Sequence, residues 1–153
     1  MKVEIVDRPA LRLASVRHVG SYMRVNEAFT RLNDLVTTSG LSGPGTLLVG
    51  IYHDDPAVTP EEKLRSDAAI TIPAETKLPP GLTEMALPAG RYAHATHHGP
   101  YSGLGETWGH IRNEWLPRSG EKAGDGMSYE VYPNTPMNAK PQELVTELYL
   151  PLK

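Results

Sequence analysis

The chain of 153 residues carries 15 Lys and Arg against 18 Asp and Glu, and its length and 39% hydrophobic content fit one globular domain. The net charge of -3 argues against direct nucleic-acid binding, and the absence of cysteine excludes disulfides, thiolate metal sites and a cysteine nucleophile. Residues 1–7 lack the apolar run of a signal peptide, and no stretch is apolar for long enough to span a membrane, so we expect a cytoplasmic protein.

The first half of the chain predicts two strands, a helix and two further strands. The helix covers residues 22–37 and ends at Gly40, because its apolar residues recur at helical spacing. These residues are Val25, Phe29, Leu32 and Val36. The extended runs are residues 3–7, 10–17, 46–52 and 67–73.

The second half repeats this order. A strand at 91–97 precedes a helix at 103–116, and extended runs follow at 127–132 and 143–150. When Gly99 is superposed on Gly20, Phe29 aligns with Trp108, and with a slip of one residue Gly50 aligns with Glu130. The apolar stripe of the second helix is formed by Leu104, Trp108, Ile111 and Trp115. The pattern indicates a duplicated strand–helix–strand–strand unit.

The duplication predicts an α+β fold in one domain of residues 1–153. Repeat one covers about residues 1–73, a Pro-rich linker about 74–90 and repeat two about 91–153. Short connections within each repeat favour antiparallel pairing. We expect one curved antiparallel sheet with both helices on one face and a ligand groove on the other.

Strand alternation assigns side chains to the two faces of that sheet. The residues expected under the helices are Met127, Tyr129, Val131, Leu144, Leu148, Leu150, Leu47, Val49 and Ile51. The residues expected in the groove are Ser128, Glu130, Tyr132, Val145, Glu147, Tyr149, Leu48, Gly50 and Tyr52. Tyr101 begins the second helix as Tyr22 begins the first, and we treat both as candidate walls of the groove. Trp108 lies on the apolar stripe, which favours a core position, and from the rim its ring could reach a ligand.

Carboxylates among tyrosine rings are typical of a site for an organic cation, because ring faces and the carboxylate both attract positive charge. The alternative for Glu130 and Glu147 is a solvated sheet face on which they pair with Lys or Arg.

Two other polar clusters favour structural roles. Asp54, Asp55 and Asp67 lie near Arg65, which we expect to bridge the loop carboxylates. A second cluster contains His94, His97 and His98. Three histidines without a further ligand are a weak metal signal, and His97 and His98 are expected to shape the turn before the second helix. We predict no metal and no cofactor.

Motifs along nearly the whole chain resemble gyrase-inhibitor-like small-molecule-binding proteins, whose domain also serves as the effector-binding part of AraC-type regulators. The matching segments are Gly50–Pro73, Gly90–Ala93, His98–Tyr101, Trp115–Pro117, Glu130–Tyr132 and Glu147–Pro151. The resemblance implies a duplicated fold with a central pocket, in which Glu130 matches the acid at the pocket centre and Glu147 the acid of the last strand.

The resemblance also implies a function. In length the chain resembles the stand-alone members, which sequester ligands or modulate DNA gyrase, and we expect it to bind amphipathic or cationic drug-like molecules. The alternative is a hydrolase of reactive drug-like compounds with Glu130 as its catalytic acid or base. DNA gyrase is a candidate partner, and neither nucleic acid nor a membrane is an expected one.

Overall fold

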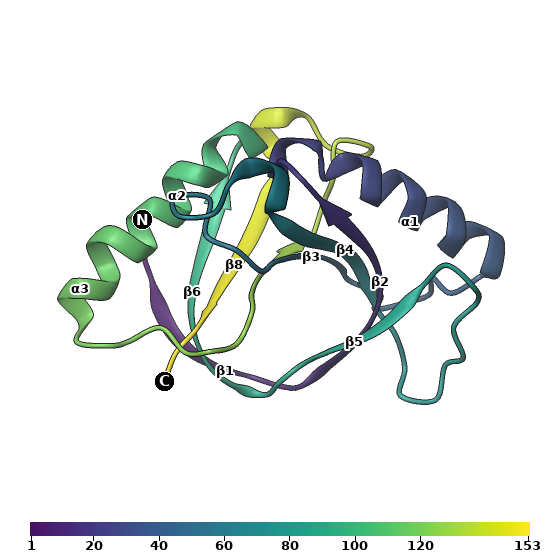
Figure 1. Ribbon diagram of the computed structural model, residues 1–153, viewed down its shortest axis with the longest axis horizontal. Coiled ribbons are helices and arrows are strands. Elements are labelled where there is room, and N and C mark those ends of the chain that lie inside the picture. The colour runs from purple at the N-terminus through teal and green to yellow at the C-terminus, as the bar shows by residue number, and fades with distance from the viewer. The chain divides into compact units, whose positions relative to one another are not determined.

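The β-branched and aromatic runs form antiparallel strands and the amphipathic runs form helices in the computed structural model, which describes residues 1–153 (Figure 1). The α+β class expected from the sequence is confirmed. The chain divides into two compact units, which we call the first-repeat unit (Ala10–Leu87) and the second-repeat unit (Met1–Pro9 with Pro88–Lys153). None of the helices is long and apolar enough to cross a membrane.

In the first-repeat unit, one helix packs on a sheet with the strand order β3-β4-β2-β5. The elements are β2 (Leu11–Val19), α1 (Asn26–Ser39), β3 (Leu48–Tyr52), β4 (Arg65–Thr71) and β5 (Thr83–Leu87). The apolar face of α1 contributes Ala28, Leu32 and Val36 to the core. Gly40 ends α1, as expected, with a left-handed φ of 68° that residues with a Cβ rarely adopt.

The second-repeat unit has the strand order β1-β6-β8-β7. Its elements are β1 (Glu4–Arg8), β6 (Gly90–His98), α2 (Leu104–His110), a π-helical turn (Ile111–Trp115), α3 (Leu116–Ser119), β7 (Ser128–Tyr132) and β8 (Val145–Pro151). The single helix expected at 103–116 is therefore irregular. Pro117 has no N–H to donate to the carbonyl four residues before it, and the N–H of Leu116 bonds to Ile111 five residues back.

Two strands lie outside the expected repeat boundaries. The strand β1, expected in repeat one, pairs with β6 of the second-repeat unit, with Val6 opposite Tyr92. The strand β5 lies in the segment expected as a linker and pairs with β2. Both pairings join segments far apart in the chain, which periodicity alone does not detect.

The predicted faces of β7 are wrong, whereas those of β8 are confirmed. Leu148 of β8 packs against Ile111 of the helical segment, and Glu130 of β7 lies directly opposite Leu148. Because opposite residues of an antiparallel pair share a face, Glu130 and Tyr132 face the helix. Tyr129 and Val131, expected under the helix, lie on the other face.

The same correction applies to β3. Leu48 packs into the core beneath α1, so Gly50 and Tyr52 face that helix, whereas Val49 and Ile51 face away from it. In β3 and β7 the more apolar face does not identify the side under the helix, because both faces of these strands are buried. Val49 and Ile51 are 0% exposed, and all five residues of β7 are buried.

Candidate functional site

Glu130 is a buried carboxylate among aromatic side chains. It is 3% exposed, and its two oxygens accept hydrogen bonds from different rings. The indole Nε1–H of Trp108 donates to Oε2 over 2.6 Å, and the hydroxyl of Tyr132 donates to Oε1 over 2.7 Å. Tyr132 follows Glu130 by two positions in β7 and therefore lies on the same face of the sheet.

Trp108 reaches Glu130 because the apolar stripe of α2 faces the sheet. Its ring packs at the edge of the core that contains Ile111. Arg112 lies one turn further on, with its guanidinium carbon 5.4 Å from the centre of the indole ring. The same guanidinium donates to Ser128 Oγ over 3.0 Å. The indole is therefore held between the core and a cation, with its N–H directed at Glu130.

Tyr101 completes the aromatic surround. It opens the 3-10 turn before α2, and its ring meets that of Tyr132 edge to face, with centroids 5.8 Å apart. Burial, followed by the negative charge of Glu130, raises the pKa of Tyr101. The sequence-predicted residues Glu130, Tyr132, Tyr101 and Trp108 are thus brought together, and we call them the Glu130 cluster.

Glu147 and Tyr149 lie on the opposite face of the same sheet. The register of β6 and β8 places Tyr149 opposite His94 and Glu147 opposite Thr96. Glu147 accepts hydrogen bonds of 3.0 Å from the hydroxyl of Thr96, and its other partner is His94. The sheet therefore divides the predicted site into two separate groups.

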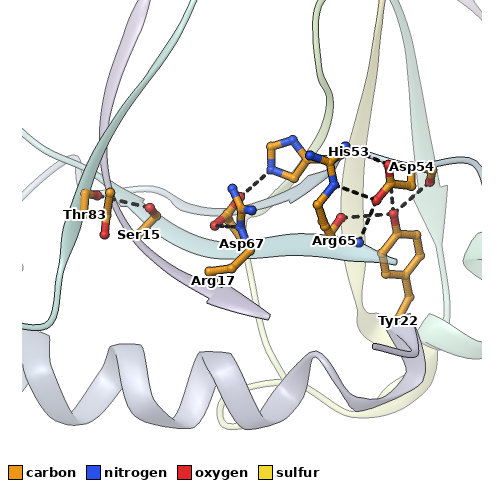
Figure 2. Close-up of polar contacts among 8 residues, drawn as sticks. All are labelled: Ser15, Arg17, Tyr22, His53, Asp54, Arg65, Asp67 and Thr83. Carbon is orange, nitrogen blue, oxygen red and sulfur yellow. Dashed lines mark hydrogen bonds and ion pairs between the residues drawn. The ribbon is translucent and has the colours of Figure 1, made fainter. Parts of the chain in front are cut away.

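Tyr52 belongs to the first-repeat unit. Its ring lies edge to face with Tyr22, with centroids 5.0 Å apart. Figure 2 shows the hydroxyl of Tyr22 against the loop at Asp54, where it donates to the carbonyl of that residue over 2.7 Å and accepts from its N–H over 3.0 Å. Tyr22 therefore holds the loop at Asp54 in place.

Asp54 and Asp67 form two separate networks, which Figure 2 shows. Arg65 donates to both oxygens of Asp54, over 2.9 and 3.0 Å, which confirms the expected bidentate bridge for this acid. The hydrogen bonds from Arg65 lower the pKa of Asp54 to about 2. Asp67 instead accepts from Arg17 over 2.9 Å and pairs with His53.

His97 has a role in local structure. The ring of His97 bonds to the carbonyl of Pro100 over 2.9 Å and to the hydroxyl of Thr107 over 2.8 Å, so its expected role in the turn before the helix is confirmed. No group of three or more His, Asp or Glu side chains is arranged to hold a metal ion.

Some residues that the sequence did not indicate lie next to the Glu130 cluster and next to Glu147 and Tyr149 on the opposite face of the sheet. Arg112 lies against the indole of Trp108, and Tyr92 and Arg8 contact the rings of the opposite face. Ser128, which strand alternation places on the same face as Glu130, accepts a hydrogen bond from the Arg112 guanidinium. The Arg112 position, one turn after Trp108, was detectable from helical spacing. Arg8 was not, because its contacts follow from the pairing of β1 with β6.

The sequence model of a protein family, the GyrI-like small molecule binding domain, matches residues 1–153. A protein of Erwinia billingiae named DNA gyrase inhibitor is 31% identical over 156 residues, which cover 99% of this chain and 97% of the relative.

Two solved structures share the fold. The EcmrR C-terminal domain superposes with a TM-score of 0.82 at 18% identity, covering 99% of this chain and 97% of that one. The structure of SAV2435 bound to tetraphenylphosphonium superposes with a TM-score of 0.68 at 12% identity, covering 100% of this chain and 94% of that one.

Proposed function

Because the chain belongs to the family of GyrI-like small-molecule-binding domains, we propose that it binds lipophilic organic cations at the Glu130 cluster. The observation that carries the proposal is the buried carboxylate of Glu130, which accepts its hydrogen bonds from the aromatic side chains Trp108 and Tyr132. Tetraphenylphosphonium, the compound bound to the structural neighbour SAV2435, supplies a probe of this class.

The charge of the cluster favours a cation over a neutral or anionic ligand. A desolvated carboxylate attracts a cation more strongly than a solvated one, and each ring face adds about 0.5–2 kcal/mol. A bulky cation with spread charge also carries little hydration to lose on entering an aromatic pocket. An anion would instead meet a like charge at Glu130.

Entry requires α2 to yield, because Glu130 is 3% exposed and Trp108 covers it. The helix is suited to this movement, since its seven residues include Gly105 and Gly109, which have low helix propensity. We therefore expect the ligand to replace the Trp108 hydrogen bond with its own charge.

The test is a titration of wild type and Glu130→Gln with tetraphenylphosphonium, followed by calorimetry, with triphenylphosphine oxide as the neutral comparison. Glu130→Gln keeps the shape and removes the charge, so the cation should bind at least about 30-fold more weakly, and the oxide should be affected far less. The matched control is Glu106→Gln, which removes an exposed acid from α2 and should leave the affinity within about 3-fold.

Two results would contradict the proposal. One is equal affinity of wild type and Glu130→Gln for the cation. The other is a loss seen only in Glu147→Gln, which would assign the cation to the other face of the sheet. The roles of DNA gyrase inhibitor and of hydrolase stay predictions for this chain, the first supported by the name of the Erwinia billingiae relative.

A further inference from the structure

Three tyrosines cluster on the face of the second-repeat sheet that is turned away from α2. Tyr92, Tyr129 and Tyr149 come from β6, β7 and β8 and are 2%, 1% and 8% exposed. Tyr129 and Tyr149 stack with centroids 4.9 Å apart, and Tyr92 meets them edge to face at 5.5 and 6.3 Å. We call these residues the tyrosine cluster.

The tyrosine cluster already holds a cation. The guanidinium carbon of Arg8 lies 4.4 Å from the ring centre of Tyr149, and Arg8 Nε–H donates to the hydroxyl of Tyr129 over 3.1 Å. Burial raises the pKa of both tyrosines, so at neutral pH they present neutral rings. The attraction for Arg8 is therefore that of aromatic faces and a hydroxyl for a planar cation.

Acidic and aromatic neighbours extend this surface. Glu147 lies two positions before Tyr149 on the same face of β8, and His94, its partner, stacks on Tyr149 with ring centres 4.9 Å apart. A cavity of about 550 Å³ opens beside them, lined among others by His94, Thr96, Lys2 and Glu4. Its volume is in the range of small-molecule sites.

The strand β1 connects the cavity with the tyrosine cluster. The chain around Lys2 and Glu4 lines the cavity, and the same strand delivers Arg8 to the rings. Within this unit β1 is an edge strand that pairs only with β6, and most of its residues are exposed. An edge strand of this kind can exchange its contacts at lower cost than a central one.

We infer that the tyrosine cluster is a second cation site, which Arg8 fills as an internal ligand, and that small planar organic cations of the guanidinium type compete with Arg8 for it. The tether gives Arg8 an effective concentration on the order of millimolar, so the wild type binds such cations weakly. Removal of Arg8 exposes the site. It is separate from the proposed site at Glu130, which lies on the opposite face of the sheet.

The experiment compares Glu130→Gln with the double variant Glu130→Gln/Arg8→Ala, so that the Glu130 cluster contributes no charge. Phenylguanidinium is titrated into each, with calorimetry and the near-ultraviolet dichroism of tyrosine as readouts. The variant without Arg8 should bind at least about 10-fold more tightly, and phenylurea, the neutral counterpart, should not gain. The control is Arg91→Ala in the same background, because Arg91 lies on β6 but pairs with Glu121.

When Tyr149→Leu is added to Glu130→Gln/Arg8→Ala, the gain in phenylguanidinium affinity should be lost, because the ring under the guanidinium is removed. Arg8→Met, which keeps the aliphatic stem, provides a second variant in case Arg8→Ala loosens β1. Equal affinity with and without Arg8 in both variants would overturn the inference, as would an equal gain for phenylurea. A failure of the Glu130 proposal is recognised separately, because tetraphenylphosphonium would then bind Glu130→Gln as tightly as it binds the wild type.

Discussion

The two repeats share a scaffold of hydrogen bonds at equivalent positions. The bond from His18 Nε2 to Ser21 O corresponds to that from His97 Nε2 to Pro100 O, and each is 2.9 Å long. The bond from Gly20 N to Leu64 O, 2.8 Å, corresponds to that from Gly99 N to Leu144 O, 2.9 Å. The bond from Arg65 N to Asp54 Oδ2 corresponds to that from Val145 N to Asn134 Oδ1, and each is 2.8 Å long. The duplication inferred from the sequence is therefore visible in individual bonds.

The repeats differ where the proposed site lies. Glu130 and Trp108 of the second repeat align with Gly50 and Phe29 of the first. The two differences belong together, because a buried carboxylate requires donors and the indole N–H supplies one that a phenyl ring lacks. A buried, hydrogen-bonded carboxylate is thus present in one repeat only, through a matched pair of residues on a common frame.

The helices differ in the same sense. The helix α1 is a continuous run of 14 residues, whereas the equivalent segment of the second repeat is divided into α2, a π-helical turn and α3. The irregular helix covers the buried carboxylate. The regular helix covers an apolar core. The comparison indicates that local helix stability is lower over Glu130, where we propose that a ligand enters.

The largest expected effect distinguishes Asp67 from Glu147, the acids that the two repeats carry on strand faces turned away from the helices. Asp67 is 2% exposed and held by Arg17 and His53, whereas the side chain of Glu147 is 21% exposed. Asp67→Asn should lower the free energy of unfolding by about 2–3 kcal/mol and Glu147→Gln by less than about 1 kcal/mol. Urea denaturation measures both, and equal losses would show that burial does not separate these acids.

A smaller effect tests the matched pair in the Glu130 cluster. Trp108→Phe gives the second repeat the ring type of the first and leaves Glu130 without the indole N–H. The free energy of unfolding should fall by about 1–2 kcal/mol. Trp115→Phe is the control, because Trp115 packs at the edge of the same core and should cost less. If both changes cost the same in denaturant titration, ring size rather than the hydrogen bond accounts for the loss.

The smallest effect concerns the loop that Asp54 anchors, where the second repeat has Asn134. Asp54→Asn keeps the acceptor for the Arg65 N–H and removes the charge, so unfolding should become easier by about 1 kcal/mol at pH 7. The pKa of Asp54 is lowered from 3.8 to about 2. The stabilisation by the carboxylate is therefore complete above pH 4 and lost as the pH falls towards 2.

The measurement is the free energy of unfolding of wild type and Asp54→Asn between pH 7 and pH 2. The difference between the two proteins should be constant near neutrality and shrink in the acid range. A difference that stays constant down to pH 2 would show that the ion pair with Arg65 contributes nothing.

Much of the candidate site could be predicted from the sequence. Alternation places Glu130 and Tyr132 on one face, because residues two apart on a strand point the same way, and the helical stripe places Trp108 toward the sheet. Alternation also separates Tyr129 from Glu130. It does not state which face meets the helix, and in β7 and β3 that choice was wrong.

The sequence by itself determined the duplication, the α+β class, the family and the residues that share a strand face, because these follow from local spacing and from aligned motifs. The tertiary structure decided which face of β7 lies under α2, that β1 joins β6, and that Arg8 enters the tyrosine cluster. Both faces of β7 are buried, so polarity carries no information about its orientation. The pairing of β1 joins segments more than half the chain apart, and only register and packing specify it.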